Sequence, residues 1–245
     1  MNKRSCYALV SVAVVALLAG CATRSISDAG PPGQNHSANP SYRGELTEFD
    51  VVGINPKHAI TEADIGQALA ASADIRLHRG SPVMVIQSGA RIPDTEMLKA
   101  LKQYFRVGAF SGIPPVPGIP ADNYARALRL AAAKGGYGTI VVYWGTLESG
   151  IQNPQNKAIS WIPLVGWSIN DETELMRIQL KMALIDVRSG TWRLFIPPPF
   201  TASKKSDFFT RTSTDQSLVS QLKSKAYSVA TQKLFEEFGD GEAGS

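Results

Sequence analysis

The chain has 245 residues, of which 44% are hydrophobic and 19% are charged, and its formal net charge is +4. This composition is normal for a globular protein. No Lys/Arg tract is present, and residues 1–20 hold two of the 25 basic residues and none of the 21 acidic ones, so the remainder carries only +2. We therefore expect no binding to nucleic acid.

The first twenty residues have the features of a secretory signal peptide. Lys3 and Arg4 form a basic start. An apolar run of about 13 residues follows, which suits a signal sequence and is too short to span a membrane as a helix. Residues 18–21 read Leu-Ala-Gly-Cys and resemble a bacterial lipobox, in which cleavage before Cys21 precedes lipidation of its thiol. The resemblance implies a lipoprotein anchored in a bilayer by acyl chains such as palmitate.

Two further consequences follow from this resemblance. Ala22 follows the cysteine, with no aspartate there, and this resembles the pattern sorted to the outer membrane in Gram-negative bacteria. We therefore expect an outer-membrane anchor with the domain facing the periplasm. Cys6 would leave with the signal peptide and Cys21 would carry lipid, so no disulfide is expected. The alternatives are an ordinary secretory signal with a chance cysteine, or an uncleaved anchor.

A polar segment separates the signal peptide from the rest of the chain. Residues 23–43 are rich in Ser, Pro, Gly and Asn and contain almost no large apolar side chain. Such a segment buries too little surface to offset the entropy lost on ordering. We predict a disordered tether over residues 21–45, which holds the domain some tens of ångströms from the lipid. A single domain is predicted over residues 46–240.

Helix and strand patterns alternate along the predicted domain. Thr61 and Asp64 predict a capping box for a first helix that reaches about Ser72, with Ile60 and Ile65 as its hydrophobic staple. Apolar periodicity predicts the remaining elements. They are helices capped by Asp94, starting near Ala121 and covering 216–238, and strands over 82–87, 107–113, 139–144, 177–184 and 191–196.

The alternating strand is the clearest of these elements. Ile178, Leu180, Met182 and Leu184 alternate with polar residues, which predicts that all four face the core. Met97, Leu98, Leu101 and Phe105 are expected on one helix face, and Leu218, Leu222, Ala226, Val229 and Phe235 on another. The element order predicts an α+β fold, in which a mixed sheet carries helices mostly on one face.

The element order and the turn over 184–190, which reads LIDVRSG, resemble a known domain. It is shared by the amino-terminal part of TolB and the curli-secretion-channel family of lipoproteins. The resemblance covers roughly residues 80–238 and implies a non-catalytic envelope role, as a channel or as a periplasmic interaction module. The insertions PPVPGIP and PPPF and the first helix depart from the family pattern and count against a channel.

Few residues suggest catalysis or metal binding. Of the three histidines, His36 lies in the predicted tether, and His58 and His78 flank the first helix without metal-ligand spacing. The cluster Asp171-Glu172-x-Glu174 lacks the spacing of a known cation loop. We expect no cofactor, no metal and no enzymatic activity. The alternatives are a periplasmic hydrolase such as a peptidase, which needs a cleft joining His58 or His78 to Asp or Ser, and an envelope channel subunit.

Residues 160–167, SWIPLVGW, contain two of the four tryptophans. Pro163 and Gly166 disfavour a central strand, so we predict a loop or edge arm that either folds back onto the sheet or points its tryptophans outward. The candidate interaction residues are Trp161, Ile162, Leu164, Val165 and Trp167. The expected partners are the bilayer, through acylated Cys21, and an envelope protein or a second copy of the chain.

Overall fold

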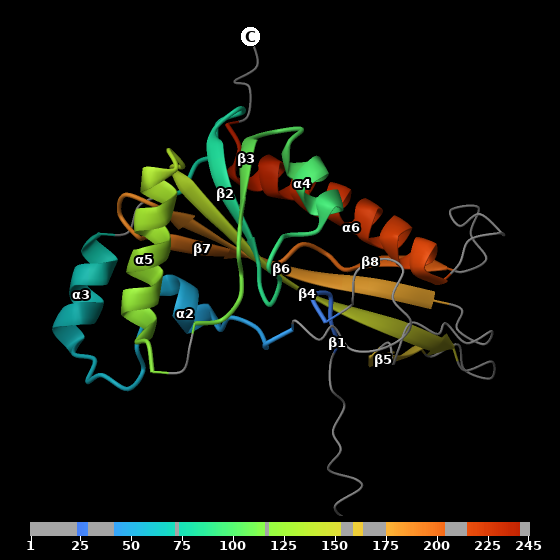
Figure 1. The fold of residues 1–245 in the computed structure, drawn as a ribbon, viewed down its shortest axis with the longest axis horizontal. Coiled ribbons are helices and arrows are strands. Elements are labelled where there is room, and N and C mark those ends of the chain that lie inside the picture. The colour runs from blue at the N-terminus through green and yellow to red at the C-terminus, as the bar shows by residue number, and fades with distance from the viewer. Residues whose placement is uncertain are drawn as a thin grey trace, which may run out of the picture.

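The computed structural model describes residues 24–28, 42–71, 74–115, 118–152, 159–163, 175–203 and 215–240. These residues form an eight-stranded mixed sheet with helices packed against it (Figure 1). Within these ranges, no helix is long and apolar enough to cross a membrane.

The central part of the sheet has the strand order β3-β2-β4-β6-β7. The strands β2, β3 and β4 run parallel, whereas β6 is antiparallel to β4, and β7 is antiparallel to β6. Farther along the same strands, β1 and β5 both pair with β4, and β8 pairs with β6. The strands are β1 (Arg24–Ser25), β2 (Pro82–Gln87), β3 (Arg106–Phe110), β4 (Thr139–Gln152), β5 (Ile159–Pro163), β6 (Leu175–Asp186), β7 (Trp192–Phe195) and β8 (Phe200–Ser203).

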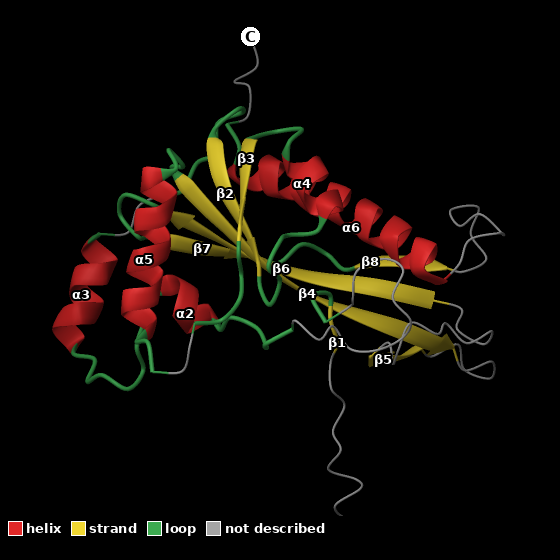
Figure 2. Ribbon diagram, in the orientation of Figure 1, coloured by secondary structure: helices red, strands yellow, loops and turns green. Residues whose placement is uncertain are grey.

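Helices cover both faces of the sheet (Figure 2). Val83 and Val85 of β2 belong to a hydrophobic core with the helices α4 and α6, whereas Met84 and Ile86 belong to a second core with α2 and α5. Successive side chains of a strand point to opposite faces, so the two cores lie on opposite sides. The helices are α2 (Glu48–Val52), α3 (Glu62–Ala70), α4 (Thr95–Leu101), α5 (Ala121–Lys134) and α6 (Asp215–Phe238).

The predicted α+β class and mixed sheet are confirmed, and the predicted elements occur in the predicted order. The placement of the helices mostly on one face is corrected, because α2 and α5 cover the face opposite to α4 and α6. Four elements were not predicted as such. They are β1, α2, β8 and the extension of β4 beyond residue 144.

The predicted alternation in β6 is confirmed at Ile178, Leu180, Met182 and Leu184, which are all buried. Ala183 and Ile185 are buried as well, because α5 covers the second face of this half of the strand. Apolar and polar residues therefore alternate only in the part of β6 where a single face of the strand is buried.

The last helix differs in part from its prediction. Leu222 and Ala226 are buried as expected, but Val229 is exposed. The buried face instead includes Tyr227 and Leu234. Over 24 residues, more than one set of apolar residues at α-helical spacing can be chosen as the buried face. Packing against α4 decides which face of α6 is buried.

Helix α3 begins as predicted, but it buries none of its residues. The Thr61–Asp64 capping box is formed in both directions. None of the helix residues is buried, and Ile65 and Leu69 expose 46% and 73% of their surface. Ile60, the other half of the predicted staple, is 57% exposed. The local sequence therefore forms the helix without a core to receive it.

Candidate functional site

The N-terminal segment (residues 24–28) is part of the folded domain, so the prediction of a disordered tether is wrong for these residues. Arg24 and Ser25 pair with Leu147 and Thr146 of β4. Ile26 is 1% exposed and belongs to the same core as α4 and α6. Residues 42–45, before the predicted start at 46, also contact the domain, since the Tyr42 ring lies against Gly89 and Glu45 accepts from Ser25. Residues 29–41 lie outside the described residues.

The side chain of Ile26 enters the core where β4 has a glycine. A Cβ placed on Gly145 would lie 2.8 Å from Cδ1 of Ile26 and 2.9 Å from Cδ2 of Leu180. The backbone N–H of Ile26 donates to the carbonyl of Gly145 at 3.0 Å. The absent side chain at Gly145 thus makes room for Ile26 in direct contact with the strand.

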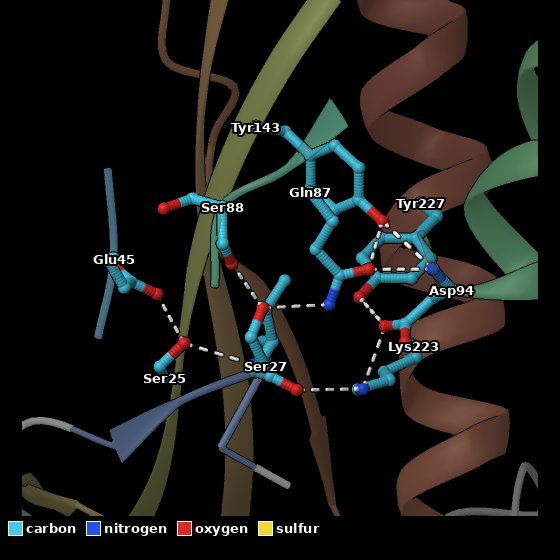
Figure 3. Close-up of polar contacts among 10 residues, drawn as sticks. Ser25, Ser27, Glu45, Gln87, Ser88, Asp94, Tyr143, Lys223 and Tyr227 are labelled. Carbon is cyan, nitrogen blue, oxygen red and sulfur yellow. Dashed lines mark hydrogen bonds and ion pairs between the residues drawn. The ribbon is translucent and has the colours of Figure 1, made fainter. Parts of the chain in front are cut away.

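Buried polar groups surround this segment, as Figure 3 shows. Ser27 donates through its hydroxyl to the carbonyl of Ser88 and accepts from Nε2 of Gln87 at 3.0 Å. Ser25 donates to Glu45, and its Oγ accepts from the N–H of Ser27 at 3.0 Å. Burial raises the pKa of Glu45 above its ordinary value. Every serine of the segment therefore has partners within the domain.

On the other side of the segment, Lys223 of α6 connects it to Asp94. The ammonium of Lys223 donates to the carbonyl of Ile26 at 3.2 Å and to Oδ2 of Asp94 at 2.8 Å. The hydroxyl of Tyr227 donates to the same carboxylate oxygen at 2.6 Å, and Tyr143 donates to Gln87 at 2.5 Å. The pKa values of both tyrosines are raised well above 10.0, first by burial and then by the charge of Asp94.

Asp94 precedes α4 as predicted, but it does not cap the helix with its side chain. Its carboxylate points instead to Lys223 and Tyr227, because a buried ammonium needs a charged partner more than a helix end needs one acceptor. The network connects β1, β2, β4, α4 and α6. It contacts the N-terminal segment at the carbonyl of Ile26 and the hydroxyl of Ser27, so it holds this segment in place.

The second feature is an arm made of β5 with residues 147–152 of β4 and 175–178 of β6. Trp161 of β5 lies opposite Gly150 of β4 and is partly buried. The guanidinium of Arg177 lies 4.1 Å from the centre of the Trp161 ring and also pairs with Glu148. Arg177 therefore holds the aromatic ring through a cation–π contact while its charge is neutralised.

The predicted edge arm folds back onto the sheet over residues 159–163, where it pairs with β4. Of the candidate interaction residues, only Trp161 has a described side chain. Ile162 lies opposite Ser149 in the strand register. Leu164, Val165 and Trp167 lie outside the described residues, as do Cys21 and the cluster at residues 171–174.

Each of the two described histidines contacts one polar side chain. His78 pairs through Nδ1 with Asp240, and both side chains are largely exposed. His58 contacts Asn55 at 3.3 Å. Among the described residues, no group of three His, Cys, Asp or Glu side chains is placed to hold a metal ion.

Reasoning from the sequence missed Ser25, Ile26, Ser27 and Lys223. A first signal was available, since Ile26 is a large apolar residue in an otherwise polar stretch. Tyr42 is another, and it packs on Gly89, where an added Cβ would lie 2.8 Å from the tyrosine ring. Isolated apolar residues of this kind are compatible with disorder and with docking, and composition alone does not separate the two.

Comparisons with known proteins identify a family. No curated protein matches the chain. Two solved structures are similar at low identity. A dodecamer of a PelC variant from Paraburkholderia phytofirmans has 14% identity and a TM-score of 0.29, over 65% of this chain and 94% of that one. A putative neuraminyllactose-binding hemagglutinin homolog from Helicobacter pylori has 12% identity and a TM-score of 0.27, over 69% and 91%.

Neither structural likeness is strong enough to support an argument about function. The family model is more informative, because the YafT bacterial lipoprotein model matches residues 47–237, well over half of the chain. The matched region contains the sheet and the helices α2 to α6 almost completely. The chain therefore belongs to the YafT family of bacterial lipoproteins.

Proposed function

We propose that this lipoprotein is lipidated at Cys21, anchored in the outer membrane with its domain facing the periplasm, and acts as a non-catalytic interaction or assembly component of the cell envelope. Membership of a lipoprotein family supports the lipobox interpretation of residues 18–21. The resemblance to the TolB and curli-secretion-channel domain points to the same class of role. The partner is an envelope protein or a second copy of the chain.

One observation carries the interaction role, namely the exposed apolar side of α3. Ile60, Ile65 and Leu69 all expose about half of their surface or more, although the helix has a complete capping box. A helix of nine residues is marginal in water without tertiary contacts. An apolar helix surface of this kind is typical of elements that are covered by a partner.

The anchor is tested by Cys21→Ser. We expect this variant to accumulate as an unprocessed precursor, because the peptidase and the acyl transfer both require the cysteine. Metabolic labelling with palmitate followed by membrane fractionation measures the loss of lipid. Labelling that persists unchanged in Cys21→Ser would show that the lipoprotein interpretation of this site is wrong.

The interaction surface is tested by the double variant Ile65→Ser/Leu69→Ser. Since both side chains are exposed, thermal unfolding should change little, as it does for most surface substitutions. Crosslinking yield in cells and the mass of the detergent-solubilised protein by light scattering should both fall. The control is Ile92→Ser, which removes an equally exposed apolar side chain before α4. Equal crosslinking in both variants would refute the role of α3.

A further inference from the structure

The N-terminal segment begins very close to the proposed lipid anchor. Arg24 is only three residues from Cys21. Three extended residues span about 10 Å at most. The folded domain therefore starts within about 10 Å of the acylated residue, in place of the tens of ångströms expected for a long tether.

The segment is held from both sides, so its direction is fixed relative to the domain. The N–H of Ile26 donates to Gly145 of β4, and its carbonyl accepts from Lys223 of α6. Its side chain is buried in the core. Arg24 is also within 4.0 Å of Asp28 at the other end of the segment. Because of these contacts, residues 24–28 have a fixed position relative to the sheet.

The register of β4 decides where the chain leaves the sheet. Arg24 pairs with Leu147, and the next position along β4, Glu148, is already paired with Pro163 of β5. The chain must therefore leave β4 at Arg24, next to the base of the arm. The arm continues from Leu147 over five further residues to Gln152, or about 17 Å. It is longer than the link to the lipid.

We propose that the N-terminal segment holds the domain directly on the bilayer, so that the arm lies along the lipid headgroups with Trp161 at the interface. This inference rests on the proposed lipidation of Cys21. Ile159 at the outer end of β5 is 41% exposed, and Trp161 is partly exposed beside Arg177. Tryptophan, with an apolar ring and a polar N–H, is enriched at this depth of a membrane. The short link makes the bilayer the nearest surface to the arm.

The test uses single cysteines as attachment sites for a fluorophore. Cys6 leaves with the signal peptide and Cys21 carries lipid, so an introduced cysteine is the one free thiol of the mature chain. Ile159→Cys places the label on the arm. Leu69→Cys places a control label on α3, which lies at the opposite end of the molecule from β5 (Figure 1). Both positions are exposed.

The purified lipoprotein is reconstituted in vesicles of phosphatidylethanolamine and phosphatidylglycerol that contain nitroxide-labelled lipids. The nitroxides quench a fluorophore only when it lies near the lipid. We expect several-fold stronger quenching at residue 159 than at residue 69. Equal quenching at the two positions overturns the proposal. So does an arm label that the lipid nitroxides do not quench but that an added envelope protein shields from solvent.

Two spacing variants test the role of the short link. A Gly/Ser insert of about 12 residues adds roughly 20 Å of reach. Placed between Ala22 and Thr23, it should lower quenching at residue 159 to the level at residue 69. The same insert between Gly33 and Gln34 lies beyond the N-terminal segment and should leave quenching unchanged. Neither insert alters a described residue. An equal effect of both inserts contradicts the inference.

The outcome is separable from that of the proposed function. Palmitate labelling and vesicle flotation are measured on each protein before quenching. A chain that carries no lipid refutes the anchor at Cys21. A lipidated, vesicle-bound chain whose arm is not quenched refutes the orientation alone.

Discussion

At the scale of single residues, Asp94 has a different role in the structure from the one that its sequence position predicts. A local rule assigns it to a helix cap, whereas its carboxylate neutralises Lys223, 129 residues away. The two side chains are only 22% and 10% exposed. A charge buried to this extent is tolerated because it is paired and hydrogen-bonded. The pair in turn holds the carbonyl of Ile26.

The Asp94–Lys223 pair should show strong energetic coupling. Asp94→Asn leaves the ammonium of Lys223 without a charged partner, which should cost roughly 3 kcal/mol of unfolding free energy. Lys223→Met in the same background should cost clearly less than it does alone, with a coupling of about 0.5–3 kcal/mol in urea denaturation. The control is Lys233→Met, which breaks the exposed pair with Glu236 and should cost under about 0.5 kcal/mol. Additive losses would contradict the coupling.

The buried tyrosines predict a loss of stability at alkaline pH. The pKa values of Tyr143 and Tyr227 are raised in the folded state. Below pH 10.0, therefore, both phenols are neutral in the folded chain and in the unfolded chain. Above pH 10.0 the tyrosines of the unfolded chain ionise first, which stabilises the unfolded state and lowers the stability of the fold. Tyr227→Phe should flatten this decline in urea midpoints, although it lowers stability at neutral pH. An unchanged slope above pH 10.0 would argue against the assignment.

At the scale of elements, the strands and helices were predictable where one periodic pattern matches one covered face. The alternation in β6 is such a case, and so are the capping box of α3 and the turn after Asp186, whose side chain accepts from the N–H of Ser189 at 2.6 Å. The extension of β4 beyond residue 144 escaped prediction because Gly145 and Gly150 interrupt its apolar pattern, and β5 was predicted only as a loop or edge arm because it ends in Pro163. Within this extension, a Cβ on Gly150 would lie 3.0 Å from the side chains of Leu175 and Trp161, so the glycine leaves room for both.

The register of β6 predicts opposite outcomes for neighbouring residues. Leu180 is buried, so Leu180→Ala should cost roughly 2–5 kcal/mol. Lys181 pairs with Glu48 and lies 5.0 Å from the Trp144 ring, so Lys181→Ala should cost about 1 kcal/mol or less. Chemical denaturation of the two variants measures the difference. Similar losses at both positions would mean that the register is wrong.

At the scale of the whole molecule, the N-terminal segment joins the proposed anchor to the core. It contacts both the central strand β4 and the last helix α6. In the proposed arrangement this segment follows the anchor immediately and sets the orientation of the domain relative to the bilayer. The exposed side of α3 lies at the other end of the molecule from the arm and remains accessible (Figure 1).

The segment should therefore contribute to the stability of the entire domain. A chain shortened to residues 41–245 loses the burial of Ile26 and should be less stable than one that begins at Thr23, by roughly 2–5 kcal/mol or more. Calorimetry of both soluble forms tests this. Ile26→Ala in the longer form is the matched control and should show a large part of the loss. Equal melting temperatures of the two forms would show that the segment does not stabilise the core.

Local patterns in the sequence were sufficient to predict the order of the main elements and the α+β class, and they also carry the signal-peptide and lipobox predictions. They were sufficient because each depends on residues that are neighbours along the chain or share one face of one element. Only the tertiary structure decided that helices cover both faces, that Asp94 pairs with Lys223, and that residues 24–28 belong to the core. These features depend on contacts between distant segments, and the space that Gly145 leaves for Ile26 exists only once β4 has been placed in the sheet.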